Sequence, residues 1–321
     1  MIIHNATIHS PIERFATALH IDNGVIVWMG DEDTAHMRSS AFPNASLVDV
    51  GKALVLPAFH HPFVTTQTQP SLINQGVTAI HQVFDTPHDL VEPNNLDFTA
   101  IYHDNPTPPS IHLIHDQPEA VLQTFSTPPP TGVERAIWVS QPDEVAILQQ
   151  LHDQGVRGRA YISATTTISA ELLTGWQVVV IFDGPVQFGL GELTQAGIPF
   201  SIGGPASPWE LITQALLTGP HPISARAAFT AMTRGAWRLT PGNSSPRGVL
   251  AVGSPADIAI WQVDALAVQA PDESRAIWST DKKAGTPLLP ALGDDETPPQ
   301  LRGLIRSGEV LSDQGLGLNA S

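Results

Sequence analysis

The chain has 321 residues, and its 15 basic and 31 acidic residues give a formal net charge of −16. This length has room for one barrel-sized domain and a smaller one, and 42% apolar residues are enough to fill a core. Cysteine is absent, which excludes disulfides and thiolate metal ligands. The acidic balance and the lack of a run of basic residues argue against nucleic acid as a partner.

The sequence predicts neither a membrane span nor a secretory signal. No apolar run approaches the ~18 consecutive residues that cross a bilayer. Residues 1–5 contain no basic segment, and no apolar stretch of the signal-peptide kind follows them. We therefore expect a cytoplasmic protein without a membrane partner.

Residues 1–52 contain short apolar runs separated by turn residues, which predicts β-hairpins. The clearest turn is Asn23-Gly24, between the apolar runs 18–21 and 25–30. An Asn-Gly pair suits a two-residue hairpin turn because both positions need a positive φ. The start of the chain is therefore expected to form a small β-structure.

From residue 53 onward, short apolar runs alternate with helix-like stretches, a pattern that predicts a parallel sheet. The stretch 142–154 has apolar residues at helical spacing, opens with Pro142 and acidic residues, and closes at Gly155. The runs expected to form strands are 53–59, 77–83, 111–115, 136–140, 159–163, 178–182 and 198–202, with 98–102 left open.

Seven or eight such units in ~190 residues make a short barrel, because a (β/α)8 barrel typically takes about 250 residues. A compact or incomplete barrel is therefore expected, with some helices reduced to loops. In such folds the carboxyl ends of the strands face the ligand site. Functional residues should be sought there.

Three stretches resemble the amidohydrolase superfamily. Leu56-Pro57-Ala58-Phe59 is similar to that superfamily's strand-one signature, Leu-Pro-Gly-Phe, which precedes a His-x-His metal pair. Residues 247–261 resemble its Gly-x-Leu-x-x-Gly-x-x-Ala-Asp motif and the β-run that follows, with matches at Gly248, Leu250, Gly253, Ala256 and Asp257. Residues 301–311 look like its closing hairpin.

The resemblance implies an α/β fold with two domains. Residues 53–245 would form a compact or incomplete (β/α)8 TIM-like barrel. Residues 1–52 and 246–321 would together form a small composite β-sandwich. The activity that the resemblance implies is hydrolysis of non-peptide carbon–nitrogen bonds.

The metal ligands of the superfamily are missing from the matching places. Amidohydrolases hold one or two divalent metals with a His-x-His pair on strand one, a carboxylated Lys or a Glu on strand four, single His residues on strands five and six, and an Asp on strand eight. The metal lowers the pKa of bound water. The matching places here are Phe63 and Thr65, the run 136–140 without Lys or Glu, the run 159–163 without His, Phe182, and Gly203. We therefore expect a degenerate metal site, with no metal at the family positions and no other cofactor.

A second hypothesis places one zinc-like divalent metal on other residues at predicted strand ends. His60 and His61 follow the first run, and neighbouring residues of a strand face opposite sides, so only one of them can face the site. His61, His81 and His115 are the candidate ligands, because imidazole suits a metal such as zinc. Asp183, after a later run, is the candidate catalytic residue.

Two functions remain open on this scaffold. In the first, the protein is an amidohydrolase-like hydrolase of carbon–nitrogen bonds with a rearranged metal site or none. In the second, it is a catalytically inactive relative that binds a small molecule or forms a fixed assembly. The missing ligands favour the second function, without turnover, because function depends on the site rather than on the fold. Both functions imply a small-molecule ligand or substrate. Whether the protein forms a homo-oligomer is left open.

Overall fold

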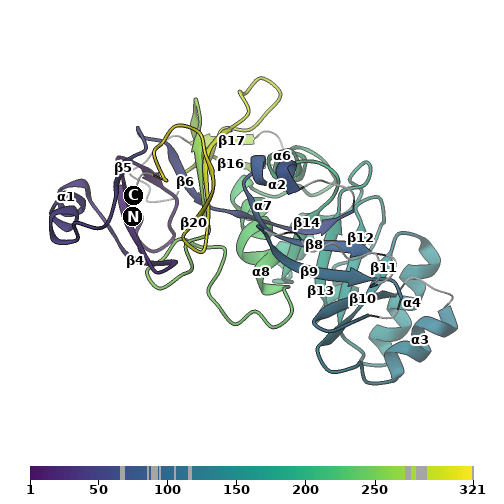
Figure 1. The fold of residues 1–321 in the computed structure, drawn as a ribbon. Coiled ribbons are helices and arrows are strands. Elements are labelled where there is room, and N and C mark those ends of the chain that lie inside the picture. The colour runs from purple at the N-terminus through teal and green to yellow at the C-terminus, as the bar shows by residue number, and fades with distance from the viewer. Residues whose placement is uncertain are drawn as a thin grey trace. The chain divides into compact units, whose positions relative to one another are not determined.

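The computed structural model of the chain describes residues 1–65, 69–84, 87, 93, 95–104, 106–114, 118–271, 276–279 and 288–319. The chain divides into two compact units, which Figure 1 draws together. The first unit comprises Met1–His60, Thr68–Thr78 and Ser244–Ser321, and the second comprises His61–Gln67 and Ala79–Asn243. No helix among the described residues has both the length and the apolar character needed to cross a membrane.

The first unit contains two main β-sheets, to which both ends of the chain contribute (Figure 1). The strands of one sheet are, in spatial order, β4 (Val25–Gly30), β3 (Ala18–Asp22), β1 (Ile2–His4) and β5 (Leu47–Asp49). The strands of the other are β2 (Thr7–Ile8), β6 (Leu54–Pro57), β15 (Ile258–Gln262), β19 (Gln300–Arg306) and β20 (Glu309–Asp313). Because β6 pairs antiparallel with β15, N-terminal and C-terminal segments share a sheet.

A single hydrophobic core joins these two sheets. Ile3, Leu19 and Ile26 enter it from the first sheet, Val55 and Ile258 enter it from the second, and all five are fully buried. Burying an aliphatic side chain of this size contributes ~1.5–3 kcal/mol relative to leaving it in water. The expectation of a β-sandwich formed by both termini is confirmed.

The predicted hairpin at Asn23-Gly24 is present as the antiparallel pair β3 and β4. Asn23 has φ 48° and Gly24 has φ 79°, as the turn requires. A Cβ atom at Gly24 would lie 2.5 Å from the carbonyl oxygen of Ser307. Glycine therefore serves both the turn and the close approach of the loop between β19 and β20.

The remaining elements of the first unit are short. Helix α1 (Glu32–Ala41) begins where the Asp31 carboxylate accepts a hydrogen bond of 2.8 Å from the Thr34 backbone N–H. Helix α2 covers Gln69–Asn74. A third sheet among the described residues contains β16 (Leu266–Pro271), β17 (Ala276–Ser279) and β18 (Leu289–Pro290).

The second unit is built on a parallel sheet of eight strands in the described part of the chain. The strands lie side by side in chain order: β7 (Phe59–Val64), β8 (Val77–Phe84), β9 (Asp97–Tyr102), β10 (Ser110–Ile114), β11 (Val133–Val139), β12 (Arg159–Ser163), β13 (Gln177–Ile181) and β14 (Phe200–Gly203). Gly203 on one edge strand closely approaches Phe63 on the other. The sheet is therefore a nearly closed barrel, as the sequence predicts.

Helices and short turns lie between these strands or follow the last of them (Figure 1). They are α3 (Pro118–Ser126), α4 (Pro142–Asp153), the 3-10 turn η2 (Glu171–Leu173), α5 (Leu190–Gln195), α6 (Pro208–Leu217), α7 (Ala225–Thr230), the π-helical turn η3 (Ala231–Gly235) and α8 (Ala236–Arg238). The predicted helix 142–154 is confirmed as α4. Single-turn connections such as η2 explain how eight strands fit into so short a barrel.

The interpretation of residues 53–59 as one strand is wrong. They divide between β6 in the sandwich and β7 in the barrel, with Ala58 at the break. The Ala58 backbone N–H donates to the Asp257 carbonyl, whereas the Phe59 backbone N–H donates to the Gly76 carbonyl. Because β7 continues to Val64, His60 and His61 lie inside the first barrel strand and not at its end.

Candidate functional site

Aromatic side chains pack together inside the barrel around Phe63. Phe63 is the fifth residue of β7, and its ring centroid lies 5.5 Å from that of Trp138 on β11 and 5.6 Å from that of Tyr161 on β12. These rings pack against a buried cluster that includes Leu113 and Ile181. The described surroundings of Phe63 are therefore largely apolar and aromatic.

Gly203, at the end of β14, has little space for a side chain. A Cβ atom there would lie 3.0 Å from the Phe63 Cβ and 3.3 Å from the Ile181 Cδ1. Both contacts are tighter than ordinary van der Waals contact. The phenyl group of Phe63 and the missing side chain at Gly203 therefore fit together.

The barrel has one more strand before residue 136 than the sequence comparison with the superfamily assumed. Because 98–102 lies within a strand, β9, the run 136–140 belongs to the fifth strand and not to the fourth. The fourth strand, β10, contains neither Lys nor Glu, and β11 and β12 contain no His. The side chains of Phe63 and Phe182 offer no metal ligand, and Gly203 has no side chain. These three residues therefore do not fit a divalent ion.

His61 and His81 are both fully buried, and each contacts a neighbouring segment of the second unit. Burial lowers the pKa of His61 to about 4, and the backbone of Ala206 and Gly204 acts in the opposite direction. His81 Nε2 lies 3.2 Å from the Thr240 Oγ1, just beyond α8. The role of His61 and His81 as metal ligands stays a prediction.

Asp183 lies at the carboxyl end of β13 and is exposed. The buried Ser163 Oγ donates a hydrogen bond of 2.7 Å to the Asp183 Oδ1 and lies 2.6 Å from the Thr165 Oγ1. These three residues come from the ends of adjacent strands, β12 and β13. They form a polar group at this edge of the barrel. The sequence analysis named Asp183 as a candidate, but not its partners Ser163 and Thr165.

His115 lies outside the described residues, so the hypothesis of a metal site that includes it stays a prediction. Within the described residues, the only group of three side chains that could hold a metal ion is His4, Glu32 and His36, in the first unit. Sequence reasoning missed this group because His4 is 28 residues from Glu32. The available signal was the Glu-x-x-x-His spacing in α1.

Two cavities occur at the amino-terminal ends of barrel strands, and both are lined by arginines. One, of about 610 Å³, is lined by Arg135, Arg157 and Arg159 together with Glu134 and Gln177. The other, of about 410 Å³, is lined by residues that include Arg226, Arg234 and Arg238. These six arginines are all the basic residues of the second unit, which has no lysine. Sequence reasoning missed both groups because no run of consecutive basic residues marks them.

Arg159 is the buried member of the larger cavity, with 1% of its side chain exposed. Its Nη2 donates to the Glu134 Oε2 at 2.6 Å and to the Gln177 Oε1 at 3.0 Å. Arg157 is exposed and donates through Nη1 to the His152 and Val156 carbonyls. With three guanidinium groups and one carboxylate in its lining, this cavity has a net positive charge.

No family model matches the chain, and no curated protein is significantly similar to it. Solved structures resemble it in fold. A metal-dependent hydrolase from Pyrococcus furiosus, described as uncharacterized, has a TM-score of 0.58 at 11% identity, and the match covers 81% of this chain and 98% of that one. An amidohydrolase from an environmental sample of the Sargasso Sea has a TM-score of 0.55 at 13% identity, covering 98% and 93%.

Enamidase, a member of the amidohydrolase superfamily, has a TM-score of 0.53 at 14% identity, and the match covers 97% of this chain and 95% of that one. At such low identity these likenesses concern the fold. The nearly closed barrel and the sandwich built from both termini agree with them. The chain therefore has the fold of the amidohydrolase superfamily.

Proposed function

We propose that this protein uses the amidohydrolase fold as a scaffold that binds a small molecule and does not carry out metal-assisted hydrolysis at the barrel mouth. The observation that carries this proposal is the close approach of Phe63 to the position that a side chain at Gly203 would take. The 3.0 Å distance between the Phe63 Cβ and a Cβ built on Gly203 means that Phe63 would have to shift to admit an aspartate there. Phe63 also stands at a position of the His-x-His pair.

The chemistry lost with these ligands is hard to replace. Free water has a pKa of about 15.7, and a bound metal is the superfamily's means of lowering it toward neutrality. Without a metal, a general base and a stabiliser of negative charge would both be needed. Phe63, Trp138 and Tyr161, aromatic residues of the described barrel interior, supply no cation and no carboxylate or imidazole base.

The arginine-lined cavity at the amino-terminal ends of β11, β12 and β13 supports binding of a small anion. Guanidinium groups bind carboxylates and phosphates through paired hydrogen bonds. A volume of about 610 Å³ is within the range of small-molecule sites. We infer that the ligand carries carboxylate or phosphate groups and binds beside Arg157 and Arg159.

Hydrolysis of a carbon–nitrogen bond is the second candidate function. It is favoured by one observation, the hydrogen-bonded group of Asp183, Ser163 and Thr165 at the carboxyl ends of β12 and β13. Asp183 is exposed and carries the only carboxylate of this group, so it would serve as the base.

One pair of assays tests these alternatives. Tag-free protein is incubated with a hydantoin, an amide and a deaminase substrate, before and after chelator treatment and with added zinc. We expect no turnover in any condition. Turnover that the chelator abolishes and zinc restores would contradict the proposal, and metal-independent turnover lost in Asp183→Asn would establish the second candidate.

Ligand binding is measured by calorimetry with citrate and inorganic phosphate as probes. We expect saturable binding of at least one probe that weakens at least tenfold in Arg157→Gln. The control is Arg14→Gln, which changes an exposed arginine of the first unit and should leave binding unchanged. Equal binding in the two variants would rule out the arginine-lined cavity as the site.

A further inference from the structure

One group of metal-ligating side chains takes no part in the barrel. His4, Glu32 and His36 belong to the first unit, and their ligand atoms all lie within 4.8 Å of one another. We propose that these three residues bind one zinc-like divalent cation. This site goes beyond the function proposed for the barrel and does not depend on it.

The elements of the sandwich bring the three side chains together. His4 ends β1, and α1 contacts this strand. Glu32 and His36 are four residues apart in α1, so they lie on the same face of the helix, one turn apart. The His4 and His36 rings meet edge to face, with centroids 5.1 Å apart and an interplanar angle of 67°.

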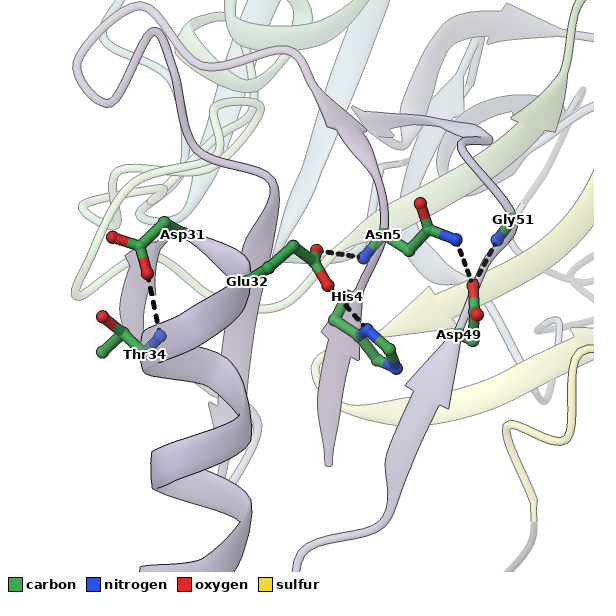
Figure 2. A network of polar contacts seen from close by, with 7 residues as sticks. All are labelled: His4, Asn5, Asp31, Glu32, Thr34, Asp49 and Gly51. Carbon is green, nitrogen blue, oxygen red and sulfur yellow. Dashed lines mark hydrogen bonds and ion pairs between the residues drawn. The ribbon is translucent and has the colours of Figure 1, made fainter.

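Neighbouring groups already hold the carboxylate in place, as Figure 2 shows. Glu32 Oε2 lies 2.9 Å from the His4 Nδ1, and Glu32 Oε1 accepts a hydrogen bond from the Asn5 backbone N–H. Asn5 has φ 53°, an unusual backbone conformation for a residue with a side chain.

A second layer of hydrogen bonds fixes Asn5 in turn. The Asn5 Nδ2 donates to the Asp49 Oδ1 at 2.7 Å, and the same oxygen accepts from the Gly51 backbone N–H at 2.7 Å (Figure 2). Groups that orient a ligand in this way are typical of metal sites, because they fix the ligand before the ion arrives. Two of the three ligands are therefore pre-positioned.

The donor set indicates the class of ion. Two imidazoles and one carboxylate form a ligand set used for zinc, which leaves a fourth position for water. Zinc binds these ligands at ~2.0–2.2 Å, and the three ligand atoms already lie within 4.8 Å of one another, so small side-chain movements would bring them to that distance. His4 is buried and constrained, but His36 is exposed and can approach by a change of rotamer. The formal net charge of −16 also favours a cation.

The test is zinc binding by the tag-free, full-length chain after chelator treatment, measured by isothermal titration with zinc chloride. The wild-type protein should bind one equivalent. His36→Ala should weaken binding at least tenfold, and Glu32→Gln should do the same while keeping the side-chain shape. The matched control is His221→Ala, because His221 is also exposed and lies 3.4 Å from the carboxylate of Glu192 without a third ligand.

Two results would overturn the inference: no zinc binding by the wild-type chain, or binding that His36→Ala leaves unchanged. Neither result depends on the proposed function of the barrel, which is tested by zinc-dependent turnover. Zinc binding that survives His36→Ala and is lost in His81→Ala would move the site to the barrel and contradict both proposals.

Discussion

Replacing Gly203 with aspartate should destabilise this protein because the new side chain would approach Phe63 too closely. The Cβ atom alone would lie 3.0 Å from the Phe63 Cβ and 3.3 Å from the Ile181 Cδ1. Overpacking of this kind costs ~1–3 kcal/mol. Burying a carboxylate beside apolar groups adds to this cost, because the charged form is poorly solvated there.

We therefore expect Gly203→Ala to lower the free energy of unfolding by about 1–2 kcal/mol and Gly203→Asp by about 3–5 kcal/mol. Gly203 does not have a positive φ, so neither change strains the backbone. Urea denaturation of the purified variants, followed by tryptophan fluorescence, measures both values.

A double-mutant cycle tests the cause. If the clash with Phe63 is responsible, Gly203→Asp should cost ~1–2 kcal/mol less in a Phe63→Ala background than in the wild-type background. A cost that is the same in both backgrounds would refute the argument that these two positions compensate for each other. So would a Gly203→Asp variant as stable as the wild-type protein.

Three further predictions concern stability. Burial lowers the pKa of His61 from 6.5 to about 4, so the unfolded chain takes up this proton more readily than the folded protein does. The stability that depends on neutral His61 is complete above pH 6.5 and should fall by ~3 kcal/mol as the pH drops toward 4. Urea titrations at several pH values should show a shallower dependence in His61→Gln, and an equal dependence would contradict this reasoning. Asp257, which is 2% exposed, accepts a hydrogen bond of 2.9 Å from the Ser307 backbone N–H, so Asp257→Ala should lower the free energy of unfolding by about 3–5 kcal/mol. Ser224 accepts from the Ala227 backbone N–H at the start of α7, so Ser224→Ala should lower the melting temperature through a loss of about 1 kcal/mol.

Local signals in the sequence predicted much of the fold. Asn23-Gly24 marked a hairpin because few other pairs adopt its turn, and the helix α4 was marked by apolar spacing between Pro142 and Gly155. The continuous apolar run 53–59 was misleading for a physical reason. It is buried on both sides of Ala58, and only the change of hydrogen-bond partner at that residue separates β6 from β7.

The site was harder to predict because its residues are brought together only by tertiary structure. The resemblance places Phe63 and Gly203 where the superfamily has metal ligands, but the sequence does not show that these two residues lie close together. In the larger cavity, Arg135 lies more than 20 residues from Arg157 and Arg159 in the sequence and becomes their neighbour only when β11 pairs with β12. The same is true of His4 and the Glu32–His36 pair.

The central claim is that the residues at the barrel mouth exclude the superfamily's metal. Anomalous diffraction at the zinc absorption edge, from crystals of the full-length protein grown with zinc, tests it most directly. The account predicts no anomalous peak beside Phe63, Tyr161 or Gly203. A peak at the carboxyl ends of the barrel strands, held by imidazole or carboxylate ligands, would contradict it.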